Sequence, residues 1–191
     1  MINLLIDAGN TSVKMAISRG DEITDETRCE ADSLIGDIDR YFHKYGHIGV
    51  VAVSDVRGLP ETIYTHLEKI CRKVIRVKGD TPLPVNNRYG TPKTLGPDRI
   101  CAAVGAHSLF PGKDCVIVDF GTAITFDFLT KEGDFLGGNI SLGLNTRFRA
   151  LNHFTGKLPL LQRVENVEQI GNCTTGAMES GVILGTIFEI E

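Results

Sequence analysis

The sequence predicts an α/β protein of two related domains, each with a mixed sheet flanked by helices. Two observations carry this expectation. The first is a short pattern that occurs twice: an apolar, β-branched run ending in Asp and followed by Gly and Thr, at Asp7 and again at Asp119. The second is an alternation of strand-like apolar runs with segments of helical spacing, which is typical of sheets covered by helices.

Each copy of the repeated pattern indicates a buried strand that delivers a carboxylate to a tight loop. Gly lets the backbone turn so closely that its N–H groups can face an anion, Thr adds a hydroxyl, and Asp can hold a cation. One copy alone would be typical of an ordinary hairpin turn. The pair, with one copy in each half of the chain, favours two domains that bind one polyphosphate between them.

The first half is expected to hold a hairpin followed by alternating helices and strands. Residues 9–12, which read Gly-Asn-Thr-Ser, separate two apolar runs and are expected to form the hairpin loop. A Pro-rich irregular stretch at 81–92 precedes the last helix of this half. The expected strands are 2–7, 13–18, 49–54 and 74–77, and the expected helices are 33–44, 60–72 and 97–109.

A second domain is expected after Pro111 and Gly112, a pair that ends the preceding helix. The boundary gives an N-terminal domain of residues 1–111 and a C-terminal domain of residues 112–191. In the second domain the expected strands are 115–119, 123–129 and 134–140, and the expected helices are 143–153 and 174–190.

Composition narrows the class of protein. The 191 residues are 42% hydrophobic with a formal net charge of −4, which is enough apolar content for a core and too acidic for non-specific nucleic-acid binding. The apolar N-terminal run lacks preceding basic residues and is interrupted by Asp7, so we expect neither a signal peptide nor a membrane span, and a cytoplasmic protein. The five cysteines are scattered without C-x-x-C spacing, which predicts reduced thiols.

The chemistry that suits these loops is phosphoryl transfer, which needs a neutralised γ-phosphate and an acceptor hydroxyl held in line. The sequence contains no G-x-x-x-x-G-K-[ST] motif, so the hairpins are expected to bind the phosphates. Lys14 can add charge there or lie on a solvated strand face. Asp7 and Asp119 suit cations, with Mg²⁺ expected at Asp7. The predicted phosphate-binding residues are Asp7, Ala8, Gly9, Asn10, Thr11, Ser12, Val13, Lys14, Gly121 and Thr122.

Asp98 is the residue that we expect to act as general base. It lies in the first turn of a predicted helix, behind Gly96 and Pro97, where a carboxylate also suits the positive helix end for purely structural reasons. Arg99 follows directly. Because neighbouring side chains on a helix point to different faces, Arg99 is expected to be free to meet an anionic group.

Four motifs, taken in order, carry a resemblance to a known family. They resemble the type III pantothenate kinases, members of the actin and sugar-kinase superfold, in which two ribonuclease H-like domains each contribute a phosphate hairpin to a nucleotide cleft. Family members usually extend further at the C-terminus. The motifs cover residues 1–185 and are Asp7-Ala-Gly9-Asn10-Thr11, Gly96-Pro97-Asp98-Arg99, Asp119-Phe-Gly121-Thr122-Ala123-Ile-Thr125, and Gly171-Asn-Cys-Thr174 with Ser180-Gly181 after it.

The resemblance implies ATP-dependent phosphorylation of pantothenate to 4′-phosphopantothenate, the first step of coenzyme A biosynthesis. It implies that the two hairpins bind the ATP phosphates, that Asp119 takes a monovalent cation such as K⁺ or NH₄⁺, and that Asp98 is the catalytic base. Loop packing for Tyr89 and helix N-capping for Thr174 remain the structural alternatives. The residues implied for pantothenate binding are Tyr89, Gly96, Pro97, Asp98, Arg99 and Thr174.

The last expected helix is apolar almost throughout, with seven large apolar side chains between Met178 and Ile190. Burial at a two-fold interface would explain them. The resemblance implies such a homodimer, with Thr174 reaching pantothenate in the neighbouring subunit. Burial beneath a further C-terminal segment is the alternative.

Two other classes of function stay open on the sequence. A non-catalytic nucleotide-binding regulatory protein of this superfold would keep the hairpins but would have no use for the motif at Asp98. A sugar kinase or a phosphatase on the same fold is not excluded by the hairpins. The choice of acceptor therefore depends on residues 89–99 and on Thr174.

Overall fold

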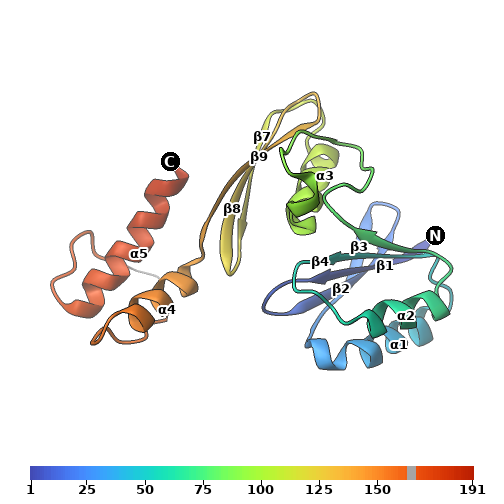
Figure 1. Cartoon of the computed structure of the whole chain (residues 1–191), viewed down its shortest axis with the longest axis horizontal. Coiled ribbons are helices and arrows are strands. Elements are labelled where there is room, and N and C mark those ends of the chain that lie inside the picture. Colours follow the sequence, from blue (N-terminus) through green and yellow to red (C-terminus); the bar gives the residue numbers. More distant parts are fainter. Residues whose placement is uncertain (163–166) are drawn as a thin grey trace. The chain divides into compact units, whose positions relative to one another are not determined.

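The computed structural model describes residues 1–162 and 167–191, and these form two compact units. The first unit comprises residues 1–117 and 127–137, and the second comprises residues 118–126 and 138–191. Both are α/β, with mixed strand directions in the first, so the predicted fold class is confirmed (Figure 1). The predicted domain boundary at 111/112 stays a prediction, and each unit is described by itself.

A five-stranded mixed sheet forms the first unit, in the order β3-β2-β1-β4-β5. Strand β1 is antiparallel to β2 and parallel to β4, while β2 pairs antiparallel with β3 and β4 pairs parallel with β5. The predicted hairpin and its loop at 9–12 are confirmed. The strands are β1 (Ile2–Ala8), β2 (Val13–Arg19), β3 (Glu22–Cys29), β4 (Val50–Asp55) and β5 (Val74–Val77).

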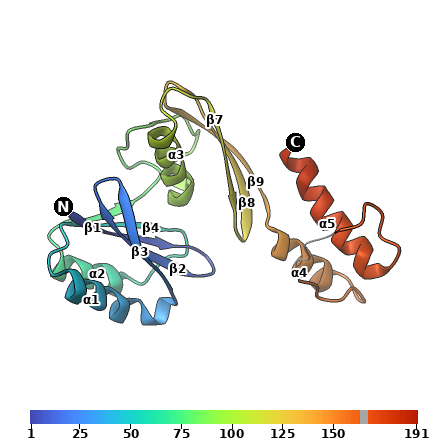
Figure 2. The same ribbon diagram turned by 180° about the vertical axis from the view of Figure 1, so that it is seen from behind.

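One face of this sheet is covered by helices α1 (Leu34–Tyr45) and α2 (Glu61–Ile70), as Figures 1 and 2 show from opposite sides. Side chains alternate along a strand, so Leu4, Ile6 and Ala8 all point to this face and are buried. The helices add apolar residues at helical spacing to the same core, which comprises Leu34, Ile38, Tyr41, Ile63, Tyr64 and Leu67 among others.

Helix α3 (Pro97–Leu109) contacts β4 and belongs to a second core of the first unit. Two short 3₁₀ helices, η1 (Ala31–Ser33) and η2 (Pro92–Thr94), precede α1 and α3. The Pro-rich stretch contains the two-residue strand β6 (Asn86–Asn87), which runs parallel to β9. The second core comprises Val85, Leu95, Ile100, Ala103, Leu129 and Phe135.

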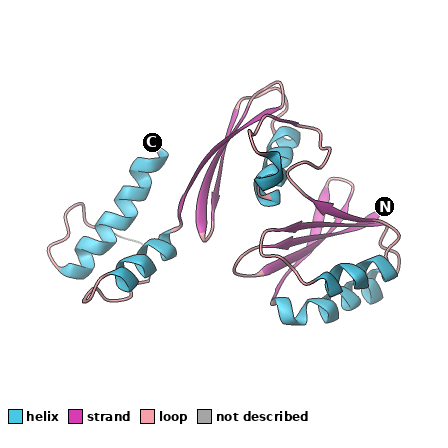
Figure 3. Cartoon of the chain, in the orientation of Figure 1, coloured by secondary structure: helices cyan, strands magenta, loops and turns pink. Residues whose placement is uncertain are grey.

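A four-stranded sheet has the order β6-β9-β8-β7. Its long strands are β7 (Cys115–Phe120), β8 (Ala123–Leu129) and β9 (Asp134–Leu142), and each continues from one unit into the other. The second unit adds α4 (Leu144–Phe154) and α5 (Thr174–Ile190), which pack against each other (Figure 3). Within the described residues, no helix has the length and apolar character needed to cross a membrane.

Candidate active site

The loop at residues 9–12 ends β1 at the same edge where β4 ends. The backbone N–H of Gly9 donates to the carbonyl of Ser12 at 3.1 Å, and the carbonyl of Ala8 accepts from the N–H of Val56 at 3.1 Å. These bonds hold the loop between β2 and the segment after β4. The loop is therefore short, fixed at both ends and rich in backbone and hydroxyl donors, as an anion-binding loop requires.

Asp7 lies on the sheet face opposite the α1 and α2 core. It pairs in register with Lys14 on β2 and with Ser54 on β4, and directly paired residues share a face. The Lys14 Nζ atom lies 3.8 Å from a carboxylate oxygen of Asp7, and both side chains are about half exposed. The structure thus brings one carboxylate and one ammonium group to the edge that carries the loop.

Asp98 sits in the first turn of α3, as predicted. Gly96 is the N-cap and Pro97 the first helical residue, a position that suits Pro because its missing N–H would have no partner within the helix. One Asp98 carboxylate oxygen accepts from the backbone N–H of Arg99 at 2.9 Å. A Cβ at position 96 would lie 2.4 Å from that same oxygen, so glycine leaves the room that the Asp98 carboxylate occupies.

Cys101 lies one helical turn after Asp98, and the charges of both predicted site carboxylates act on its thiol. The pKa of its half-buried thiol is raised to about 11, chiefly by burial and then by the negative charges of Asp7 and Asp98. Both carboxylates must lie near the thiol to act on it. The hairpin carboxylate and the expected base thus both influence Cys101, a residue that the sequence did not single out.

Arg99 is not free, and that expectation was wrong. Its side chain is buried, with 6% exposed, and its guanidinium forms a bidentate ion pair with Asp127, which is 1% exposed. Nε lies 3.0 and 3.2 Å from the two carboxylate oxygens, and Nη2 lies 2.5 Å from one of them. The pKa of Arg99 is raised, mainly by these hydrogen bonds to Asp127. Tyr89 has a smaller effect in the same direction. The guanidinium acts as a fixed, neutralised group.

Tyr89 lies beside Arg99, so the fold brings two predicted substrate-binding residues together. The Cζ atom of Arg99 is 5.4 Å from the centre of the Tyr89 ring. The backbone N–H of Tyr89 donates to the side-chain oxygen of Asn87 at 2.9 Å, and its ring lies 6.4 Å from that of Phe135. The residue is partly buried and held at both its backbone and its ring.

In the second unit, the other predicted loop is held by the start of α4. The carbonyl of Thr122 accepts from the N–H of Gly143 at 3.0 Å and from the hydroxyl of Thr146 at 2.7 Å. A Cβ at Gly143 would meet the carbonyl oxygen of Gly121 at 2.1 Å, so only glycine permits this approach. Asp119 precedes the loop near the end of β7, where it is exposed.

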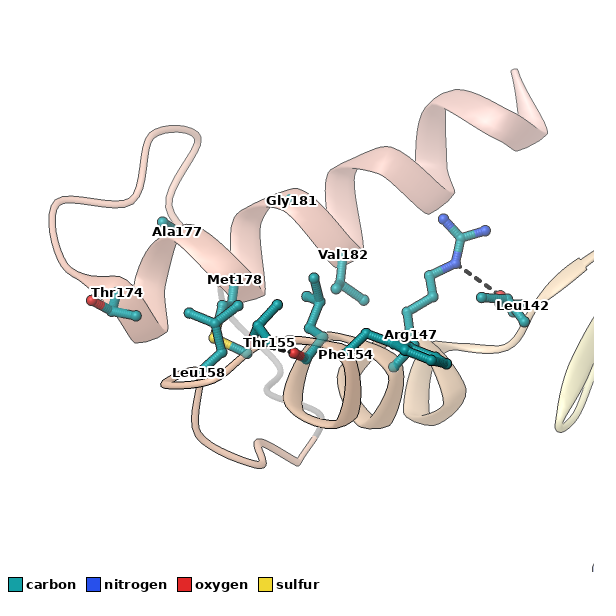
Figure 4. A pocket seen from close by; sticks show the side chains of 12 residues that line it. Leu142, Arg147, Phe154, Thr155, Leu158, Thr174, Ala177, Met178, Gly181 and Val182 are labelled. Atoms are coloured by element: carbon teal, nitrogen blue, oxygen red, sulfur yellow. Dashed lines mark hydrogen bonds between the residues drawn. The ribbon is translucent and has the colours of Figure 1, made fainter.

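Thr174 is the first residue of α5, and the N-cap is Cys173, so the N-cap interpretation of Thr174 was wrong. The Cys173 thiol is exposed, and hydrogen bonds from the Thr175 hydroxyl and the Gly176 N–H lower its pKa. Thr174 lies at one end of an apolar pocket of about 860 Å³ between α4 and α5, which Met178 and Val182 also line (Figure 4).

The residues at Asp7 fit a magnesium ion that is held together with nucleotide phosphates. No cluster of three or more His, Cys, Asp or Glu ligands occurs among the described residues, but Mg²⁺ bound to phosphates needs only one or two carboxylates from the protein. The Ser54 hydroxyl on the same face is buried and has no hydrogen-bond partner among residues 1–162 and 167–191. Such an orphan group is typical of a site completed by water or a ligand.

The fold and the family resemblance define the class of protein as an ATP-dependent phosphotransferase of the actin-like superfold. A model of the type III pantothenate kinases matches residues 3–191. A type III pantothenate kinase of Phocaeicola vulgatus is 41% identical over 192 residues, 99% of this chain and 77% of the relative. One of Flavobacterium johnsoniae is 34% identical over 188 residues, 98% of this chain and 77% of the relative.

A solved structure from Campylobacter jejuni, described as a Baf family transcriptional activator, has the same fold. Its TM-score is 0.62 at 22% identity, covering 98% of this chain and 77% of that one. The chain belongs to the type III pantothenate kinase family. Its activity is the phosphorylation of pantothenate in coenzyme A biosynthesis, so the regulatory, sugar-kinase and phosphatase alternatives are set aside.

Proposed function

We propose that Asp98 is the general base that takes the proton of the pantothenate hydroxyl as this oxygen attacks the γ-phosphate of ATP. The observation that carries the proposal is the position of Asp98 in the first turn of α3, a helix that contacts β4, the strand that pairs with β1 beside the hairpin. A general base must first be within reach of its proton, and only then does its pKa matter. A carboxylate beside the phosphate-binding hairpin meets that requirement.

The proposed phosphate-binding residues of the first unit are those of the hairpin from Asp7 to Lys14, and those of the second unit are Gly121 and Thr122. Backbone N–H groups and the hydroxyls of Thr11 and Ser12 supply donors, and Lys14, held near Asp7, supplies positive charge. Bound Mg²⁺ would neutralise phosphate charge and polarise the transferred group. Asp7 would hold that ion, and Asp119, exposed at its loop, would hold K⁺ or NH₄⁺.

Pantothenate binds beside Asp98, at Tyr89, Gly96, Pro97 and Arg99, and in this proposal Thr174 reaches the pantothenate site of the neighbouring subunit. The proximity of Tyr89 and Arg99 supports this assignment. Because Asp127 neutralises Arg99, the guanidinium serves as an oriented hydrogen-bond donor more than as a free positive charge. Tyr89 adds a phenolic hydroxyl and an apolar ring surface that suits the aliphatic part of the acceptor.

The working unit in this proposal is a homodimer in the cytoplasm. Met178 and Val182 of α5 are buried within the second unit, whereas Ile187, Phe188 and Ile190 are 42%, 71% and 46% exposed. A row of exposed apolar side chains at the end of a helix favours a covering partner. A second subunit on this surface would place Thr174 at a shared site, as the family resemblance implies.

A coupled assay of ADP formation tests the proposal. We expect turnover that depends on pantothenate, on Mg²⁺ and on K⁺ or NH₄⁺, with little activity in Na⁺ alone. The variant Asp119→Asn should lose the response to K⁺ while it keeps the response to Mg²⁺. Equal rates with K⁺ and Na⁺ in the wild-type protein would contradict the monovalent-cation site.

A further inference from the structure

Asp127 is a buried charge with no assigned role. It lies on β8 between two phenylalanines, in a run of mostly apolar residues, and only 1% of its surface is exposed. A buried ion pair pays a large desolvation penalty, and well-packed apolar residues often replace it without loss of stability. The presence of a carboxylate here therefore calls for a role other than stability.

We propose that Asp127 is a positioning residue for pantothenate: it fixes the guanidinium of Arg99, and through it the substrate-binding group formed by Arg99 and Tyr89 beside Asp98. This inference rests on the proposed binding of pantothenate at these residues. Asp127 itself does not touch the substrate in this proposal. It acts through Arg99, by setting the direction in which the guanidinium presents its other N–H groups.

The geometry of the pair supports a positioning role. Two atoms on one edge of the guanidinium, Nε and Nη2, bind the Asp127 carboxylate. A bidentate pair of this kind fixes the plane of the guanidinium as well as its position. A single hydrogen bond would leave the group able to rotate.

Arg99, the cation of this pair, also lies next to Tyr89 and forms a hydrogen bond with Asp98. Tyr89 lies over the guanidinium, at 5.4 Å from Cζ to the ring centre. The backbone N–H of Arg99 donates to the Asp98 carboxylate at 2.9 Å, so the residue anchored by Asp127 also orients the expected base. Asp127 thus ties β8 to the first turn of α3 at the point where the acceptor is expected to bind.

The variant Asp127→Asn tests this role, because it keeps the side-chain volume and removes the charge. We expect the KM for pantothenate to rise by roughly tenfold or more, since small displacements of positioning groups have effects of this size. The KM for ATP should stay within about twofold, because the hairpin does not depend on Asp127. Asp127→Glu restores the carboxylate and should give a KM for pantothenate between those of the wild type and Asp127→Asn.

The control is Asp25→Asn in the same unit. Asp25 also forms an ion pair, although a more exposed one, with Lys44 at 3.0 Å, and accepts from Tyr45 at 2.7 Å, in a network that joins β3 to α1. Losing that charge should leave the KM for pantothenate unchanged.

If Asp127→Asn fails to fold, the double variant Arg99→Met with Asp127→Leu removes both buried charges. We expect this double variant to fold and to bind ATP without using pantothenate.

Three results would overturn the proposal: equal increases in both KM values for Asp127→Asn, an unchanged KM for pantothenate in that variant, or normal pantothenate use by the apolar double variant. Any of them would leave Asp127 with a structural role only. The test is separate from that of the base, because an incorrect assignment of Asp98 appears as normal turnover in Asp98→Asn. The KM for pantothenate in Asp127→Asn decides the positioning role by itself.

Discussion

The ring of Tyr89 fills the space that a side chain at Gly137 would occupy. A Cβ at Gly137 would meet ring carbons of Tyr89 at 2.7 and 2.9 Å, and Gly137 has a φ of +89°, a conformation that other residues rarely adopt. Two separate constraints therefore require glycine at this position. One of them concerns the shape of the proposed pantothenate site, and the other concerns the backbone alone.

Gly137→Ala should therefore affect both stability and substrate use. We expect a loss of about 1 to 3 kcal/mol in the free energy of unfolding from backbone strain, and a higher KM for pantothenate because the Tyr89 ring must move. The control Gly133→Ala, also at positive φ (+84°), carries the strain without contacting Tyr89. Denaturant unfolding and steady-state kinetics measure the two effects. A raised KM in the control as well would mean that strain, and not Tyr89, is responsible.

Gly96→Ala should impair turnover more than binding. The added methyl group would occupy the space of the Asp98 carboxylate oxygen, while the φ of −59° at Gly96 suits alanine. We expect kcat to fall by on the order of tenfold or more, with the KM for ATP nearly unchanged. Gly105→Ala in the same helix meets no described atom within 4 Å and should be fully active and slightly more stable. Normal kcat in Gly96→Ala would show that the position of Asp98 is not critical.

The cysteines should differ in reactivity with iodoacetamide, because only the thiolate reacts. Cys173 is exposed and its pKa is lowered, so it should be alkylated first at pH 7 to 8. Cys101, with a pKa raised to about 11, stays protonated there and should react last, with a rate that rises only as the pH approaches that value. Asp7→Asn removes one of the charges that raise the pKa and should speed alkylation of Cys101. Mass spectrometry of timed samples measures these rates, and fast labelling of Cys101 at pH 7 to 8 would contradict the raised pKa of its partly buried thiol.

A mixing experiment tests the shared site of the proposed homodimer. Sedimentation should give a dimer, and subunits inactivated by Asp98→Asn should regain activity after exchange with subunits inactivated at Thr174. Recovery is expected because one of the two composite sites then carries both intact residues. A fully active monomer would exclude the shared site, and a dimer without recovery would leave Thr174 with a structural role.

Much of the first unit could be predicted because its signals are local. The alternation in β1 and β2 and the turn residues between them define the hairpin, and Gly96 with Pro97 marks the start of α3. Strand β3 was missed because Glu22–Cys29 is polar and largely exposed, and its strand conformation comes from pairing with β2. Strand β6, two residues within a Pro-rich stretch, likewise depends on its partner β9.

The contacts that shape the site were harder to predict from the sequence. The pairing of Arg99 with Asp127 joins residues far apart in the chain, and the approach of Gly143 to Gly121 depends on where α4 begins. One signal was present in the sequence: Asp127 interrupts an apolar strand, where a charge is costly unless it is paired. Lys113 and Lys131 lie nearer in the sequence, so the pattern could have suggested Arg99 only as one candidate partner among several.

The turnover of Asp98→Asn is the most direct test of the central claim, that Asp98 takes the proton beside a phosphate-binding hairpin. We expect kcat to fall by roughly 10² to 10⁴ while calorimetry shows ATP and pantothenate binding as in the wild type. Asp7→Ala, measured in parallel, should weaken ATP binding and leave pantothenate binding nearly unchanged. Near wild-type kcat in Asp98→Asn, with the protein folded and both substrates bound, would contradict the account.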